Sequence, residues 1–146
     1  MARIRVTKEF HFEAAHFLPR YDGLCANLHG HSYRLLVTLR GEILKDATSP
    51  KDGMVIDFSI LKSIVESNIL QVLDHSLIVR KHTYDLPATC THFRIVELDD
   101  QPTSENILLW IVERLHTALP QQVELFRVGL YETATSCAEW TVEDNA

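Results

Sequence analysis

The sequence predicts an α+β domain in which two helices cover one face of a four-stranded antiparallel sheet. Three observations predict this class. Segments near both ends alternate apolar and polar residues, which is the period of a half-buried strand. Two segments between them carry apolar residues at helical spacing behind a capping side chain. The chain has 146 residues and no internal repeat, so we expect one domain over residues 1–146.

Two long strands are expected first, over residues 3–15 and about 32–39. His16 continues the apolar parity of the first strand. The connection between them contains Pro19, Asp22 and Gly23, which are typical of a loop. The two strands are therefore predicted to form a long antiparallel pair.

The first helix is expected to begin at Asp57, a good N-cap, and its apolar stripe ends around residues 73–75. Residues 80–101 show no helical period and contain Pro87, with one short strand candidate over residues 93–98. We interpret this stretch as a long variable loop.

The second helix is expected to begin at Pro102-Thr103, with Thr103 as the N-cap, and Pro120 bounds it. Two more strands follow over residues 123–132 and 138–142, rich in apolar and β-branched residues. These complete the antiparallel sheet.

Composition limits the partners and the compartment. Hydrophobic residues make up 46% of the chain, yet no apolar run approaches the about 20 residues of a membrane span. The formal net charge of -6 argues against a nucleic-acid partner. Three cysteines and no N-terminal apolar signal core are typical of a reducing, cytoplasmic protein.

Three histidines are predicted to meet where the first two strands pair. His29 and His31 are two residues apart at a strand entry, so their side chains share a face, and Gly30 leaves room for close backbone approach opposite. His16 supplies a third imidazole from the neighbouring strand. Three neutral imidazoles suit Zn²⁺ and leave a fourth tetrahedral position for water or substrate, as in catalytic zinc sites.

Two other interpretations of these residues stay open. Each histidine could be an ordinary surface or core residue, as most isolated His-x-His patterns are. Cys25, four positions before His29, could instead ligate the metal and close the fourth position. The remaining histidines are interpreted as ordinary surface residues: His11, His82, His92 and His116.

Five short motifs share one order with a known enzyme superfamily. They are Phe12-Glu13-Ala14-Ala15-His16, Cys25 to His31, Leu73-Asp74-His75, Pro102-Thr103-Ser104-Glu105-Asn106 and Tyr131-Glu132-Thr133. Together they resemble the 6-pyruvoyl-tetrahydropterin synthase superfamily over nearly the whole chain, although residues 80–100 are longer than in short bacterial members. The spacing of three residues between Cys25 and His29 resembles that of the 6-carboxy-tetrahydropterin synthases of the queuosine pathway. The animal pyruvoyl-forming enzymes have a longer spacer there.

The resemblance implies the tunnelling fold (T-fold), in which sheets of several subunits join into an oligomeric β-barrel, commonly a homohexamer built as a dimer of trimers. It implies a zinc lyase that converts 7,8-dihydroneopterin triphosphate to 6-carboxy-5,6,7,8-tetrahydropterin, acetaldehyde and triphosphate. His16, His29 and His31 would bind Zn²⁺, whose charge would stabilise an alkoxide or enolate of the substrate.

The resemblance also implies three catalytic residues. Cys25 occupies the position of the family's base, and a thiol near a cation can be partly thiolate at neutral pH. Asp74 and His75 match a proton-relay pair. Without the motifs, the usual interpretation would be a small buried cysteine and an end-of-helix pair with no chemical role.

Glu132 shares the strand parity of apolar residues, so its carboxylate faces an apolar surface and needs a partner. The resemblance makes it the anchor of the pterin edge, which offers two adjacent donors to a carboxylate. Thr103, Ser104 and Glu105 could bind substrate as well, or serve only as capping residues of a helix.

Several choices stay open. Arg20, Lys51, Arg80 and Lys81 are all candidates for binding the triphosphate. The alternatives to the carboxy-forming lyase are pyruvoyl-tetrahydropterin formation on the same scaffold and a non-catalytic, zinc-dependent pterin-binding paralogue.

Overall fold

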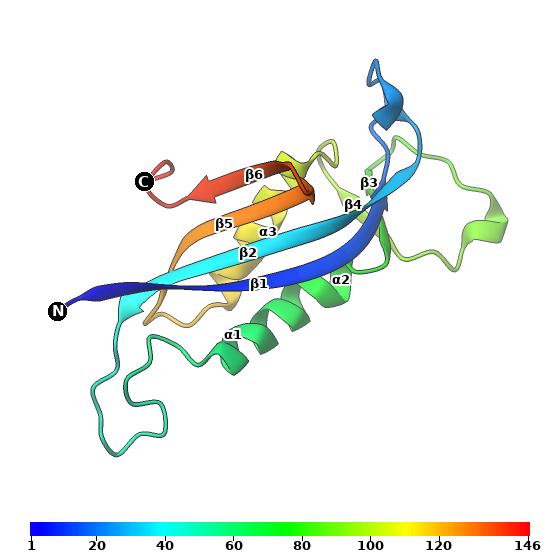
Figure 1. Ribbon diagram of the computed structural model, residues 1–146. Coiled ribbons are helices and arrows are strands. Elements are labelled where there is room, and N and C mark those ends of the chain that lie inside the picture. The colour runs from blue at the N-terminus through cyan, green and yellow to red at the C-terminus, as the bar shows by residue number, and fades with distance from the viewer.

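The computed structural model describes residues 1–146 and has the α+β class that the sequence predicts (Figure 1). The elements are β1 (Arg3–His16), β2 (His29–Glu42), α1 (Phe58–Val65), a π-helical turn (Glu66–Leu70), α2 (Gln71–Leu73), β3 (Ser76–Arg80), β4 (Ile95–Leu98), α3 (Ser104–Ala118), β5 (Glu124–Thr133) and β6 (Ser136–Thr141). Short 3-10 turns lie at Leu24–Ala26 and Ala88–Cys90.

The sheet has six strands rather than the four expected, in the order β4-β3-β1-β2-β5-β6. The predicted antiparallel set β1, β2, β5 and β6 is present, and the short strand expected over residues 93–98 is β4. Strand β3 was not predicted, and β3 and β4 add parallel pairs beside β1. Four of the five residues of β3 are buried, so this strand lacks the alternation by which half-buried strands are found.

The long β1–β2 pair determines where the site forms. Its register runs from Arg3 opposite Glu42 to His16 opposite His29, over the full length of both strands. From Val6 onward, more exposed residues of β1 alternate with more buried ones up to its last residue, His16. Because the register is set along the whole hairpin, the histidines at its far end are placed directly across from one another.

Both helical starts are capped as predicted. The Asp57 carboxylate accepts a hydrogen bond from Ser59 N at 2.8 Å, and Thr103 Oγ1 accepts one from Asn106 N at 3.3 Å. The first helical segment continues through the π-helical turn and α2 to Leu73, where the apolar pattern ends.

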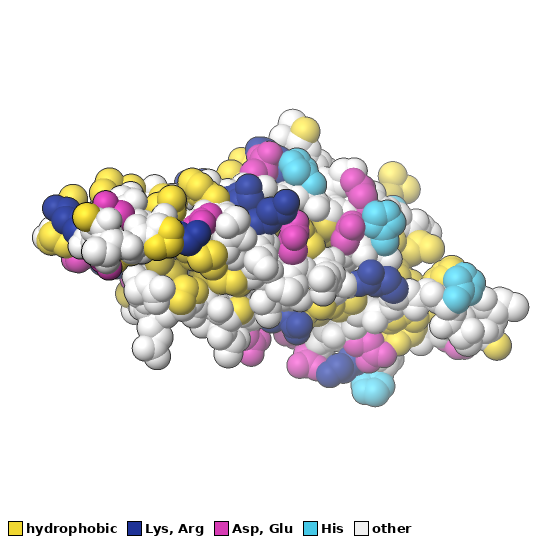
Figure 2. Space-filling model, turned by 90° about the horizontal axis from the view of Figure 1, so that it is seen from below, with side chains coloured by type: hydrophobic (Ala, Val, Ile, Leu, Met, Phe, Trp, Pro, Cys, Tyr) yellow, Lys and Arg dark blue, Asp and Glu magenta, His cyan; other side chains and the backbone are white.

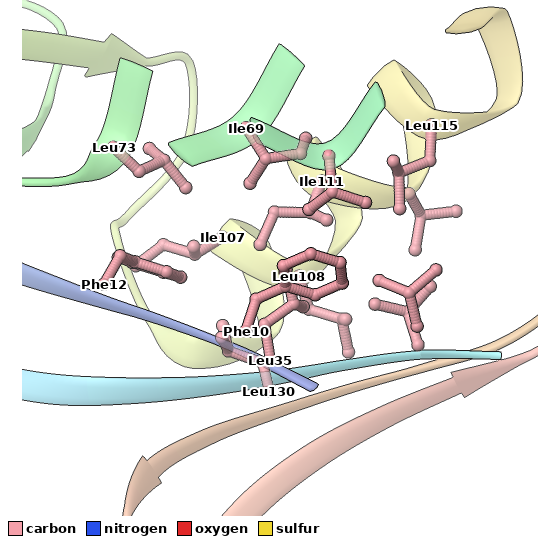
Figure 3. Packing of buried hydrophobic residues seen from close by; sticks show 14 of the residues in the cluster. Phe10, Phe12, Leu35, Ile69, Leu73, Ile107, Leu108, Ile111, Leu115 and Leu130 are labelled. Atoms are coloured by element: carbon pink, nitrogen blue, oxygen red, sulfur yellow. The ribbon is translucent and has the colours of Figure 1, made fainter. Parts of the chain in front are cut away.

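Apolar side chains of the helices pack on one face of the sheet and form a core of 22 residues (Figure 3). Phe12 and Leu35 rise from the sheet, and Ile69 and Ile111 approach from the helices. Burying each such side chain contributes about 1.5–3 kcal/mol to folding. This packing holds the helices against the sheet.

The surface carries charges of both signs. Figure 2, which looks from below the view of Figure 1, shows basic and acidic side chains interspersed on that face.

None of the helices is both long and apolar enough to cross a membrane.

Candidate metal centre and active site

Four possible metal ligands converge at the end of the β1–β2 pair. The ligand atoms of His16, His29, His31 and Glu132 all lie within 4.8 Å of one another. His16 is the last residue of β1 and is 1% exposed, and it pairs with His29, the first residue of β2. His31 follows two residues later, opposite Ala14 on the inward face. The ring centroids of the three imidazoles are 4.5 to 5.1 Å apart.

Backbone carbonyls fix the protonation of two rings. His16 Nδ1 lies 2.7 Å from Pro102 O, and His29 Nδ1 lies 2.7 Å from Asn27 O. A carbonyl oxygen only accepts hydrogen bonds, so each Nδ1 carries its hydrogen and each neutral ring presents a lone pair at Nε2.

These two Nε2 atoms lie only 3.0 Å apart. Two lone pairs at this distance repel each other unless a proton or a cation lies between the rings. The donor set of three imidazoles and one carboxylate suits a divalent cation such as Zn²⁺. The residues present therefore fit the metal that the family resemblance implies.

Glu132 lies among these donors, near the end of β5, with its side chain 24% exposed. Its Oε1 atom is 2.9 Å from His31 Nε2 and 3.3 Å from His16 Nε2. Contact with the His16 ring and the charges of the nearby imidazoles lower the pKa of this carboxyl. Burial lowers the pKa of the His31 imidazole, and its Nε2 makes no hydrogen bond. Glu132 was expected at the pterin edge, and the structure also brings it within reach of a metal.

Cys25 does not belong to the group of ligand atoms. It lies partly buried in the 3-10 turn Leu24–Ala26, in the connection between His16 and His29. Its carbonyl accepts a hydrogen bond from Leu18 N at 2.9 Å, which closes the base of this connection. The Cys25 thiol is therefore not one of the possible metal ligands in this structure.

Asp74 and His75 form a pair beside β1. Asp74 Oδ1 lies 3.0 Å from His75 Nδ1 and accepts a hydrogen bond from Glu13 N at 2.9 Å. His75 N in turn donates to Glu13 O, and its φ of 58° is left-handed. A left-handed backbone at a residue other than glycine is strained, and here two contacts with β1 hold it in place.

The imidazole of this pair points outward. The His75 side chain is 75% exposed and, with Gly30 and His31, lines a shallow hollow of about 430 Å³. A Cβ at Gly30 would lie 3.4 Å from Ala14 O, so glycine allows the backbones of β1 and β2 to approach closely here. The Asp74–His75 pair is therefore accessible from the protein surface.

Thr103 and Glu105 lie where α3 begins, directly after Pro102. Thr103 acts as the N-cap, and Glu105 is exposed in the first turn. The contact of His16 with Pro102 O brings this helix start to the histidine group.

Sequence reasoning missed Tyr33, whose fully buried ring lies 5.6 Å from His31 and 4.9 Å from Phe12. Its hydroxyl makes no hydrogen bond, and burial, with the charge of Glu132, raises its pKa. The alternating pattern of β2 indicated an inward residue but gave no sign of an unpaired hydroxyl.

The Tyr33→Phe protein is expected to be more stable than the wild type by about 1 kcal/mol, because it removes an unpaired buried polar group at nearly constant shape. Chemical denaturation of the metal-free proteins measures the change. Tyr131→Phe, on the partly buried end of β5, serves as the control and is expected to stay near the wild type. A clear loss of stability in Tyr33→Phe would show that the hydroxyl has a partner.

Comparison with known proteins identifies the family of this chain. The family model described as 6-pyruvoyl tetrahydropterin synthase matches residues 5–143. The chain is 36% identical to the 6-carboxy-5,6,7,8-tetrahydropterin synthase of Haemophilus influenzae, over 93% of this chain and 97% of that protein. It is 38% identical to the Synechocystis protein of the same name, over 92% and 91%.

The fold is shared with a solved structure at lower identity. A catalytic-residue mutant of the Plasmodium vivax 6-pyruvoyltetrahydropterin synthase is 24% identical, and the match covers 96% of this chain and 98% of that one, with a TM-score of 0.74. This likeness shows that the chain has the fold of that structure.

Proposed function

Because the chain belongs to the 6-pyruvoyl tetrahydropterin synthase family, we propose that it is a zinc-dependent carbon-carbon lyase of 7-deazapurine (queuosine) biosynthesis. Its substrate is 7,8-dihydroneopterin triphosphate. With consumption of water, the products are 6-carboxy-5,6,7,8-tetrahydropterin, acetaldehyde and triphosphate.

One observation carries this proposal: the 36–38% identity, across nine-tenths of the chain, to two relatives named 6-carboxy-5,6,7,8-tetrahydropterin synthase. The three-residue spacer between Cys25 and His29 supports the same branch of the family. The convergence of three imidazoles supports the metal.

His16, His29 and His31 hold the zinc ion through their Nε2 atoms, since the carbonyl partners of two rings leave these nitrogens free to coordinate. When bound, zinc supplies positive charge that stabilises negative charge on oxygens of the substrate side chain.

Cys25 removes a proton from the substrate side chain, and Asp74 with His75 relays protons. The position of Cys25 between two proposed ligands, outside the group of ligand atoms, supports a role toward substrate rather than metal. The hydrogen bond that Asp74 accepts from Glu13 N and its contact with His75 Nδ1 support an oriented imidazole.

Glu132 accepts hydrogen bonds from the paired donors of the pterin edge, and the start of α3 with Thr103 and Glu105 lines the same site. Its second carboxylate oxygen is free of the contacts with His16 and His31, which both involve Oε1. Partial exposure leaves this oxygen within reach of a ligand.

Arg20 is the candidate of the four cations that best fits the triphosphate. Lys51 forms an ion pair with Asp57 and Lys81 forms one with Asp99, while Arg80 Nε donates to the backbone carbonyl of Asp99. Arg20 lies in the connection between His16 and His29 and forms no ion pair. A guanidinium there can bind phosphate oxygens in a bidentate manner.

The active form is proposed to be a homohexamer built as a dimer of trimers, with the chain folding as one domain. The sheet of one copy ends at β4 and β6, and both edges are free to pair with other copies. The outward-facing His75 is then available to a neighbouring copy.

Product identification tests the proposed reaction. The zinc-loaded protein is incubated with 7,8-dihydroneopterin triphosphate, and acetaldehyde and 6-carboxy-tetrahydropterin are quantified. Release of triphosphate without acetaldehyde, and a dicarbonyl side chain in the product, would assign the pyruvoyl-forming reaction instead.

Glu132→Gln is expected to raise KM for the pterin substrate about 10- to 100-fold while the bound zinc stays at the wild-type level, because an amide cannot accept both pterin donors as an anion does. Steady-state kinetics and metal analysis measure the two quantities separately. Glu139→Gln, on β6 opposite Gly129, is the matched control. If Glu132→Gln loses its zinc, this carboxylate is a metal ligand and not the pterin anchor.

A further inference from the structure

The carbonyl that orients His16 belongs to Pro102, and the residue before it, Gln101, is held by a small hydrogen-bond network at the start of α3. Gln101 O, one residue before Pro102, accepts from Thr103 N at 2.8 Å and from Asn106 Nδ2 at 2.9 Å. The peptide before Pro102 is therefore clamped from two sides. Pro102 has a fixed φ, and Thr103 N belongs to the same peptide as Pro102 O, so the bond from Thr103 N to Gln101 O also directs Pro102 O toward His16 Nδ1.

The same network reaches the chain just beyond β1. Gln101 Nε2 donates to Pro19 O at 3.0 Å, three residues after His16. The start of α3 and the end of β1 are thereby tied on both sides of the buried imidazole. Pro102 is itself buried, so water does not readily substitute for the bond between its carbonyl and His16 Nδ1.

A second asparagine does the same for His29. Asn27 N and Asn27 Nδ2 donate to Leu24 O at 3.0 and 3.1 Å, which closes the 3-10 turn. The carbonyl of Asn27 is then left to accept the hydrogen of His29 Nδ1 at 2.7 Å. Each of the two carbonyls that contact an imidazole thus lies in a backbone segment that an asparagine side chain bonds.

We propose that Asn106 and Asn27 are positioning residues of the metal centre. They fix the Nδ1–H tautomers of His16 and His29 so that both Nε2 lone pairs face the shared point. Partners that orient a ligating histidine typically change metal affinity by about 10- to 100-fold when they are removed. This inference rests on the proposed use of the histidines as metal ligands.

The alternative is that Asn106 only stabilises the first turn of α3. Measurements on the metal-free protein distinguish a positioning role of Asn106 from a purely helix-stabilising one. In the wild type, nitrogen NMR shifts of the apoprotein are expected to show His16 in the Nδ1–H form. In Asn106→Ala and Asn106→Asp, neither of which can donate to Gln101 O, the tautomers are expected to mix.

Zinc affinity is then measured by chelator competition without substrate, and the absorption spectrum of the cobalt-substituted protein reports ligand geometry. Both Asn106 variants are expected to bind zinc about 10- to 100-fold more weakly than the wild type. Asn68→Ala is the matched control, because Asn68 Nδ2 donates to Ile64 O at 2.8 Å in a helical segment. It removes the same kind of bond away from the histidines and is expected to leave zinc affinity unchanged.

Unchanged tautomers and zinc affinity in the Asn106 variants would overturn the proposal, as would an equal loss in Asn68→Ala. If the Asn106 variants do not fold, Asn27→Ala gives the corresponding test at His29. None of these readouts needs substrate. A protein that shows the asparagine effect but releases no acetaldehyde contradicts the proposed reaction alone.

Discussion

Replacing His29 by alanine is expected to abolish stable zinc binding and to lower kcat/KM about a thousandfold. The variant keeps only two imidazoles, and loss of the metal removes about 4 kcal/mol of transition-state stabilisation. The Nε2 atom of His29 is 3.0 Å from that of His16, so the variant also relieves the repulsion within the metal-free site. The apoprotein is therefore expected to fold at least as well as the wild type.

Metal analysis after dialysis, kinetics and thermal unfolding with and without zinc measure these effects. His11→Ala is the control, since His11 is exposed on β1 and its ring pairs with Glu9, away from the three proposed ligands. Stabilisation by added zinc should be large for the wild type and for this control, and absent for His29→Ala. Full activity of His29→Ala without bound metal would contradict a metal centre.

Cys25→Ala is expected to reduce kcat about 10²- to 10⁴-fold, the usual contribution of a positioned general base, with zinc content unchanged. The thiol lies outside the group of ligand atoms, so its loss should spare the metal. Single-turnover acetaldehyde release measures the chemical step, and metal analysis checks the site.

Cys137→Ala is the control for loss of a thiol, because Cys137 is exposed on β6. Equal and negligible turnover in the wild type and in Cys25→Ala would indicate a zinc-dependent pterin-binding protein instead of an enzyme. Loss of zinc from Cys25→Ala would make the sulfur a ligand, contrary to the structure.

The parts of the fold that follow from local periodicity were predictable. Alternation indicated the β1–β2 pair, and Asp57 and Thr103 marked the starts of the two helices. Strand β3 was missed because its run Ser76–Arg80 is buried on both faces and cannot be separated from a loop or helix end by period alone. Its parallel pairing with β1 depends on tertiary packing.

The convergence of the three histidines was predictable to a similar extent. The spacing of His29 and His31 and the parity of His16 indicated one shared point. The position of Glu132 against His31 depends on the register of β5 with β2, which includes a bulge near Thr38, and no local pattern reveals it. The network around Asn106 depends on bonds between segments far apart in sequence.

The two free edges of the sheet have a consequence for solubility. A single copy exposes unpaired backbone groups along β4 and β6, and such edges add strands from any available chain. Pairing that curves into a ring uses up every edge, whereas pairing that fails to close continues into aggregates. In the proposed homohexamer, ring closure would therefore protect the chain from precipitation, and conditions that dissociate the ring are expected to be those in which it aggregates.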